Sequence, residues 1–192
     1  AVLRIDPNSL DTLLHPTLNE KSSIKVIANG LPASPGAVSG KVVFTSEEAE
    51  RLNDMMQDTI LVRVETSPED IQGMHAAKGI LTARGGMTSH AAVVARGMGR
   101  PCVSGSSEID INYEQKIFKT SSGEIKEGDI ITIDGSTGRI ILGNVPTVKP
   151  EISGDFSKLM GWADNIRKLK VRTNSETPLD TKIARDFGAE GI

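Results

Sequence analysis

The amino-acid sequence predicts an α/β domain in which strands and helices alternate. Two short apolar runs of the kind found in buried strands, TILVRV and GILTA, are each followed by a stretch with helix signals. After about residue 115 the chain changes to short β-branched runs separated by glycine turns, which indicates hairpins. Alternating strands and helices flanked by hairpins are typical of a sheet with helices packed against it.

The amino-terminal part predicts a linker followed by a β-rich start of the domain. Two prolines interrupt a weak apolar pattern in the first 22 residues, where one short helix is expected over 8–14. We then expect a strand over 23–30, a Gly/Pro loop over 31–40 and a second strand over 41–45. Thr45 with Glu48 forms a capping-box pattern, which predicts a helix from there to about residue 55.

The middle of the chain predicts a strand–helix–strand unit. The run at 59–64 is expected to be a buried strand, and the next helix has signals at both ends. Ser67 and Pro68 suit its start, and Gly79 suits its end. The run GILTA, at 79–83, is the next expected strand.

The carboxyl-terminal part predicts a hairpin and then a change of pattern. The hairpin is expected in DIITIDGSTGRIILG, where two apolar runs flank DGSTG. From Pro150 onward two amphipathic helices are expected, the second leading into a strand. Because the chain starts without methionine and stops at DFGAEGI, we expect a piece of a longer protein. The predicted domains are a linker over 1–22, the main domain over 23–148, and a linker helix with the start of a further domain over 149–192.

The composition argues against several classes of function. The net charge is −3 with both signs interspersed, so neither a nucleic acid nor an anionic membrane is expected as a partner. A single cysteine, Cys102, cannot form an internal disulfide, which favours the cytoplasm or the interior of an organelle over secretion. No apolar run approaches the roughly 20 residues of a membrane span.

The stretch ARGGMTSHAAVVARG contains a histidine in an unusual setting. A lone histidine near a helix start is most often a surface residue, or a core histidine bonded to a backbone carbonyl. Here Gly85 and Gly86 let the backbone turn sharply and approach a ligand closely. Thr88 or Ser89 is expected to cap the alanine-rich helix that follows, which places His90 in its first turn.

The amino terminus of a helix favours an anion over a cation. We therefore expect the His90 imidazole to be neutral, and a neutral imidazole is a nucleophile. Attack on a phosphoryl group would create an anion where the helix favours it. Arg84 and Arg96 lie close enough in sequence to neutralise phosphate oxygens, although each is equally consistent with a solvated surface charge.

Other chemistries fit the sequence less well. The three histidines show no ligand spacing, and Cys102 lies 12 residues past His90, so no metal site is expected. No G-x-S-x-G is present, which argues against a serine hydrolase. Cys102 is expected to be an inert thiol at the start of a buried strand.

The region from ETSPEDIQGMHAAKGILTA through GGMTSHAAVVARGMGRPCVSG closely resembles the phosphohistidine domain of phosphoenolpyruvate-utilising enzymes. Its hallmark is a GG-x-[ST]-SH turn before an alanine-rich helix, here starting at Gly85. Within this family the sequence is most similar to the pyruvate phosphate dikinase branch, and the flanking segments share that similarity. One departure is Pro101, where that branch often has a second cysteine.

The resemblance implies a swivelling β/β/α domain between an ATP-grasp domain and a (β/α)8 barrel, neither of which is in this chain. The segments 1–22 and about 149–170 would be the hinges. The implied reaction converts ATP, phosphate and pyruvate to AMP, diphosphate and phosphoenolpyruvate, with Mg²⁺ held by the absent domains. His90 would carry the phosphoryl group on Nε2. The whole enzyme is expected to be a homodimer, and the fragment alone to be inactive in the overall reaction.

The resemblance also assigns supporting residues and leaves alternatives open. Thr88 matches a threonine that plant dikinases phosphorylate for regulation, but helix capping or a bond to the histidine phosphate is the role that we favour for it. The residues expected to support the phosphate or its regulation are Arg84, Gly85, Gly86, Thr88, Ser89 and Arg96. A phosphoenolpyruvate synthase or Enzyme I of the sugar phosphotransferase system would use the same histidine. A non-catalytic scaffold or a redox module around Cys102 are the alternatives of other classes.

Overall fold

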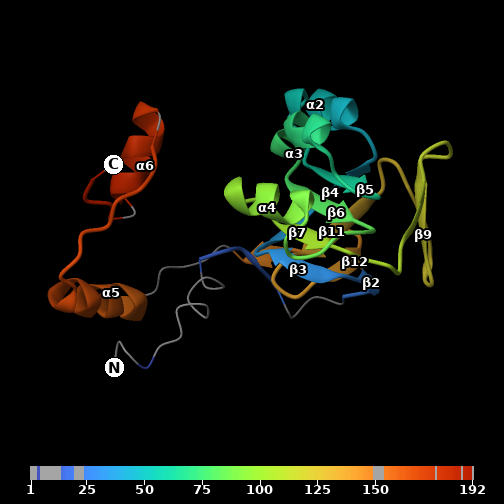
Figure 1. Cartoon of the computed structure of the whole chain (residues 1–192). Helices are drawn as coiled ribbons and strands as arrows, with labels where there is room; N and C mark the ends of the chain where they lie inside the picture. Colours follow the sequence, from blue (N-terminus) through green and yellow to red (C-terminus); the bar gives the residue numbers. More distant parts are fainter. Residues whose placement is uncertain are drawn as a thin grey trace. The chain divides into compact units, whose positions relative to one another are not determined.

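A computed structural model of the chain is shown in Figure 1. It describes residue 4 and residues 14–19, 24–148, 154–175, 177–186 and 188–191. Contacts divide the chain into a larger unit, Pro7–Glu151, and a smaller one formed by Ala1–Asp6 with Ile152–Ile192. The short helix expected over 8–14 lies, except for its last position, outside the described residues.

The larger unit is built on an eight-stranded sheet. Its strands are β2 (Val26–Asn29), β3 (Leu31–Ser34), β4 (Ala37–Val43), β5 (Thr59–Arg63), β6 (Gly79–Thr82), β7 (Cys102–Ser104), β11 (Ile130–Asp134) and β12 (Arg139–Leu142). Their order is β2-β12-β11-β4-β5-β6-β7-β3. Strands β4 to β7 run parallel, and the others pair antiparallel. The predicted hairpin is β11 and β12.

Helices connect the parallel strands. They are α2 (Ser46–Asp54), the 3₁₀ turn η2 (Pro68–Asp70) with α3 (Ile71–Ala76), and α4 (His90–Gly97). A capping box has two hydrogen bonds, and the one from the backbone to the capping side chain is present at Thr45 as predicted. Thr45 Oγ1 accepts the backbone N–H of Glu48 at 3.2 Å. In Figure 1 α2 and α3 lie at the top of the larger unit, and α4 lies below them at its left-hand side.

A small three-stranded sheet covers the opposite face of the large sheet. It consists of β8 (Asp110–Asn112), β9 (Ile117–Thr120) and β10 (Gly123–Lys126), and β9 stands at the right-hand edge of the larger unit in Figure 1. Alternate strand residues face the two layers. Ile60 and Val62 pack in the cluster that contains Phe118 of the small sheet, and Leu61 packs with the helices. The predicted α/β class is confirmed, with layers in the order sheet, sheet, helices.

The prediction of a loop over 31–40 is wrong, because most of these residues form β3 and the start of β4. Pro32 is tolerated because β3 is an edge strand that pairs only with β7. The other edge strand, β2, precedes it directly, with only Gly30 between them. A Cβ at Gly30 would lie 2.7 Å from Val103 Cγ1, so glycine is needed for this bend.

The helix expected to end at Gly79 is shorter than predicted. It ends at Ala76, and Gly79 begins β6. A Cβ at Gly79 would lie 2.7 Å from Val38 Cγ1 and 2.8 Å from Ile133 Cδ1. This glycine therefore serves the packing within the sheet and not the helix end.

The segments that flank the large sheet pair with each other. Strand β1 (Thr17–Leu18) runs antiparallel to β13 (Thr147–Val148), and Leu18 is buried with Val145. In the smaller unit, α5 (Gly154–Ile166) and α6 (Pro178–Asp186) are the two expected helices. The described helices include none that is both long and apolar enough to cross a membrane. The predicted domain boundaries stay predictions.

Candidate functional site

The candidate site lies where two neighbouring parallel strands end. After β5 the chain enters a short turn over 64–67, and after β6 it enters the glycine turn over 83–89. Because β5 and β6 are adjacent and parallel, their carboxyl ends meet at one edge of the sheet. A pocket of about 230 Å³ opens there, and its lining is Glu65, Thr66, Arg84, Gly85, Ser89, His90 and Ala91.

His90 is the first residue of α4, as the sequence predicts. Ser89 caps the helix by accepting the backbone N–H of Ala92 at 3.4 Å, so of the two predicted caps it is Ser89 and not Thr88 that the structure uses. The half-buried imidazole has its Nδ1 2.9 Å from Thr66 Oγ1. This bond occupies Nδ1 and leaves Nε2 as the ring nitrogen available to a phosphoryl group.

Thr66 is the site residue that sequence reasoning did not single out. It is 24 residues from His90 in the chain, on the turn that follows β5. Two signals were available: its place directly after a buried strand, where parallel α/β sheets collect functional residues, and its presence in the ETSPED stretch that shares the family resemblance. The bond to His90 depends on the two turns meeting in space.

The glycine turn is anchored to the sheet by hydroxyl groups. Ser89 Oγ lies 3.3 Å from Ser104 Oγ, to which Thr82 Oγ1 donates at 3.2 Å. Thr82 and Ser104 are fully buried at the ends of β6 and β7. Gly85 has φ of 112°, the left-handed region that favours glycine. These contacts fix where α4 begins and therefore where the imidazole lies.

The other predicted site residues fall in different places. Arg84 is exposed and lines the pocket. Arg96 donates from Nε to the Ala92 carbonyl at 3.1 Å and from its other end to the Met87 carbonyl, so it joins α4 to the glycine turn. Thr88 and Gly86 belong to the turn but are not among the pocket-lining residues, and a regulatory role of Thr88 stays a prediction.

Gly105 packs directly against the backbone of the glycine turn at Gly85, and a substitution at Gly105 tests whether the turn needs this close contact. A Cβ at Gly105 would lie 2.3 Å from the carbonyl oxygen of Gly85, and its φ is 64°. We expect Gly105→Ala to lower the free energy of unfolding by at least about 1–3 kcal/mol and to slow any reaction at His90. Urea unfolding measures the first effect.

The matched control for this substitution is Gly99→Ala. Gly99 has nearly the same φ, 63°, but a Cβ there would meet nothing within 4 Å. Any excess loss of stability in Gly105→Ala over Gly99→Ala therefore reports the clash with Gly85. Equal losses in the two variants would show that Gly105 does not support the turn.

Cys102 is a buried free thiol at the start of β7, as predicted. Burial raises the pKa of the Cys102 thiol to about 12, against a small opposing effect of the Arg96 charge. The thiol stays protonated at pH 8.5, so we expect no labelling by iodoacetamide in the folded chain and rapid labelling in urea. Equal labelling rates in the two states would contradict this burial.

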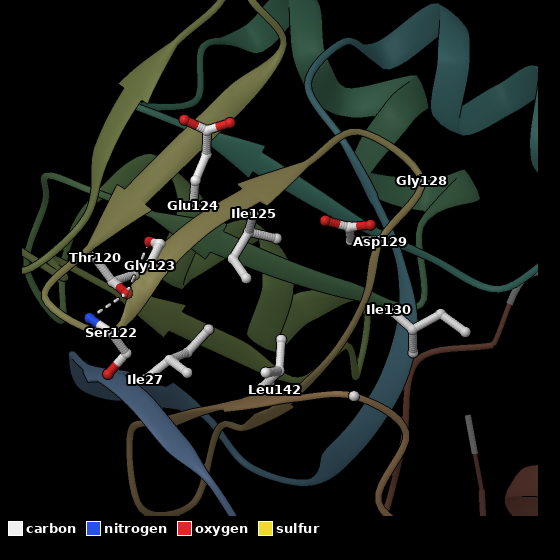
Figure 2. Close-up of a pocket in the computed structure, with 11 residues that line it drawn as sticks. Ile27, Thr120, Ser122, Gly123, Glu124, Ile125, Gly128, Asp129, Ile130 and Leu142 are labelled. Atoms are coloured by element: carbon white, nitrogen blue, oxygen red, sulfur yellow. Dashed lines mark hydrogen bonds between the residues drawn. The ribbon is translucent and has the colours of Figure 1, made fainter.

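A larger hollow of about 540 Å³ lies between the small sheet and the edge of the large sheet (Figure 2). Ile27, Ile125 and Leu142 contribute apolar surface to it. Of its two carboxylates, Asp129 already accepts the backbone N–H of Lys126 at 2.8 Å. Among the described residues no three His, Cys, Asp or Glu side chains gather as metal ligands. Chemistry therefore points to the smaller pocket at His90.

The chain is similar to known proteins, and the region matched by a family model contains this pocket. Residues 55–138 match the family model described as "PEP-utilising enzyme, mobile domain". The whole chain is 58% identical to pyruvate, phosphate dikinase of Rhizobium meliloti (strain 1021) and to that of Clostridium symbiosum, and covers 21% and 22% of them. It is 54% identical to pyruvate, phosphate dikinase 2 of Zea mays and covers 22% of that protein.

The chain thus spans about a fifth of the length of these curated relatives. A solved structure, an NMR solution structure of Enzyme I (nEIt), aligns with 58% of this chain and 40% of its own at 24% identity. The TM-score of this alignment is 0.35. The resemblance found in the sequence is confirmed by the family match, which includes the βαβ core, the glycine turn and His90. Residues 55–138 thus match the mobile domain of the phosphoenolpyruvate-utilising enzymes, and the whole chain is similar to a segment of the dikinases named above.

Proposed function

We propose that this chain is the phosphoryl-carrier part of a pyruvate, phosphate dikinase, with His90 as the residue that carries the group. The observation that supports this most directly is the hydrogen bond between Thr66 Oγ1 and His90 Nδ1 at the edge of the pocket. It orients the ring so that Nε2 is the nucleophilic nitrogen. The relatives named above supply the choice of dikinase.

The proposed chemistry uses the tautomer in which the ring, and not the Thr66 hydroxyl, is the donor in this hydrogen bond. With the proton on Nδ1, the ring donates to Thr66 Oγ1 and Nε2 has a free lone pair. That lone pair attacks phosphorus, so that an Nε2–P bond forms while the P–O bond to the donor breaks. The bonding electrons leave with the donor oxygen. The reverse step returns the group to an acceptor oxygen.

The surroundings of His90 stabilise the phosphorylated form. The first backbone N–H groups of α4 point toward its amino terminus, where a negative charge is favoured. Arg84 lines the same pocket and supplies a cation for the phosphate oxygens. This place therefore favours the negative charge that phosphorylation brings to His90.

The overall reaction needs parts that lie outside this chain. In the proposed enzyme an ATP-grasp domain binds ATP, phosphate and Mg²⁺, a (β/α)8 barrel binds pyruvate, and the whole protein is a homodimer in the cytoplasm or an organelle. The carrier domain swivels between them on its flanking segments. The pairing of β1 with β13 supports pivots that lie outside residues 17–148.

A phosphoenolpyruvate synthase is the second candidate, since it uses the same histidine chemistry. The relatives reported above favour the dikinase. The two differ in their need for inorganic phosphate, because only a dikinase passes a phosphoryl group to it and releases diphosphate. Activity of the complete enzyme without phosphate would favour the synthase.

The deciding experiment detects the carrier directly. The complete enzyme is incubated with phosphoenolpyruvate labelled with ³²P, and the adduct is tested for acid lability and base stability. We expect the label on the peptide that contains His90. A label on any other residue, or none, would overturn the proposal.

A further inference from the structure

The turn that carries Thr66 is held at both of its ends. At the start, the backbone N–H of Val64 donates to the Tyr113 hydroxyl oxygen at 2.7 Å. At the end, the backbone N–H of Ser67 donates to Asp70 Oδ2 at 2.9 Å. The carbonyl of Val64 also accepts the N–H of Arg84 at 2.9 Å, which joins this turn to the glycine turn. Thr66 is thus fixed between two anchors.

Asp70 anchors the end of the turn, and its carboxylate is itself held by several partners. Only 5% of the residue is exposed. Its Oδ1 accepts the hydroxyl of Ser46 on α2 at 3.1 Å and lies 3.4 Å from Nε of Arg63 on β5. One carboxylate therefore joins a helix, a strand and the turn. A buried group with several partners keeps its geometry better than an exposed one.

Tyr113 anchors the start of the turn and comes from the small sheet. It follows β8, and its ring lies 5.3 Å from the Arg63 guanidinium and packs edge-on against Phe44. Arg63 also donates to the Phe44 carbonyl at 3.0 Å. Tyr113 is 41% exposed, so removal of its hydroxyl leaves no cavity in the core. The small sheet, which has no residue in the pocket lining, reaches the site through this one hydroxyl.

We propose that Asp70 and Tyr113 are positioning residues for His90, which act through the turn that carries Thr66. This inference rests on the proposed function of His90. Neither residue lines the pocket. Asp70 accepts the backbone N–H one residue after Thr66, and Tyr113 accepts the backbone N–H two residues before it. With either anchor gone, Thr66 Oγ1 moves relative to Nδ1. The imidazole then divides between two tautomers, and the fraction with a nucleophilic Nε2 falls.

The test uses Asp70→Asn and Tyr113→Phe in this chain, with two readouts. The first is the ¹⁵N NMR pattern of the His90 ring, which reports the tautomer directly. The second is phosphorylation of the chain by phosphoramidate, a donor whose P–N bond breaks and releases ammonia, followed by ³¹P NMR. This spectrum separates Nε2 from Nδ1 adducts, and the variant His90→Ala assigns the signal.

Asp134→Asn is the matched control. Asp134 is also a buried carboxylate, 4% exposed, that pairs with an arginine, Arg139, at 3.0 Å. It also accepts a backbone N–H in its own turn, that of Ser136 at 3.0 Å. Its loss costs stability of the same kind without touching the turn that carries Thr66. If Asp70→Asn does not fold, Tyr113→Phe alone decides.

We expect the unaltered chain to show one tautomer and one Nε2 adduct. In Asp70→Asn and Tyr113→Phe we expect a mixed tautomer and a rate of phosphorylation about five- to tenfold lower, the size of one hydrogen bond. Effects no greater than those of Asp134→Asn would overturn the inference. An unaltered chain that forms no phosphohistidine at His90 would instead contradict the proposed function. The ¹⁵N NMR pattern of the His90 ring in the variants would then still show whether Asp70 and Tyr113 position the imidazole.

Discussion

Replacing His90 with alanine is expected to abolish the phosphoryl adduct and the overall reaction. The side chain supplies the only atom that forms a bond to phosphorus in the proposed mechanism, and no step can bypass it. We expect the rate of the complete enzyme to fall by at least about 10⁴-fold, as is typical when a nucleophile is removed. Both half-reactions should be lost together, which isotope exchange of each substrate pair measures.

The control for this substitution is His75→Ala. His75 lies in α3, and its backbone carbonyl accepts a hydrogen bond from the Arg100 guanidinium at 2.9 Å. Alanine keeps that carbonyl, so activity and adduct should remain. An adduct that persists in His90→Ala would mean that the glycine turn only packs the domain. The hypothesis that the domain is a non-catalytic scaffold would then be correct.

Thr66→Val is expected to have the next largest effect on the reaction. Valine has nearly the shape of threonine but leaves His90 Nδ1 without its partner. An unsatisfied half-buried group costs about 1–3 kcal/mol, which corresponds to roughly a 10- to 100-fold slower phosphorylation if the cost falls on the reactive tautomer. Rapid-quench measurement of the phosphohistidine with time gives this rate.

Thr66→Ser separates the hydroxyl from the packing of the methyl group. Serine retains the oxygen that accepts from Nδ1, so we expect most of the rate to return. The melting temperature of all three proteins should be close, because Thr66 lies on a turn and only part of it is buried. A valine variant with unchanged phosphorylation would show that the Thr66 bond does not select the tautomer.

Features that depend on near neighbours in the chain were predicted correctly. The cap at Thr45, the cap at Ser89 and the hairpin of β11 and β12 each rest on residues a few positions apart. The alternation of strands and helices followed from apolar periodicity, which each segment carries in itself. The role expected of His90 came from the same kind of local pattern together with a family resemblance, and it stays a prediction.

The errors arose where a residue's role depends on a distant partner. Pro32 and its neighbours suggested a loop, but an edge position in the sheet lets them pair with β7. Gly79 suggested a helix end, but side chains from β4 and β11 require a glycine there. Glycine and proline have more than one structural use, and the sequence alone does not say which one applies.

The sequence by itself determined the class of the fold and the glycine turn, and it singled out His90 as the residue proposed to carry the phosphoryl group. Only the tertiary structure decided how that residue is oriented. The bond from Thr66 to His90 spans 24 residues, and the bond from Val64 to Tyr113 spans 49. Such contacts exist because β5 and β6 end side by side and the small sheet packs beneath them. Local pattern carries no information about which strands become neighbours, so the environment of the imidazole had to come from the fold.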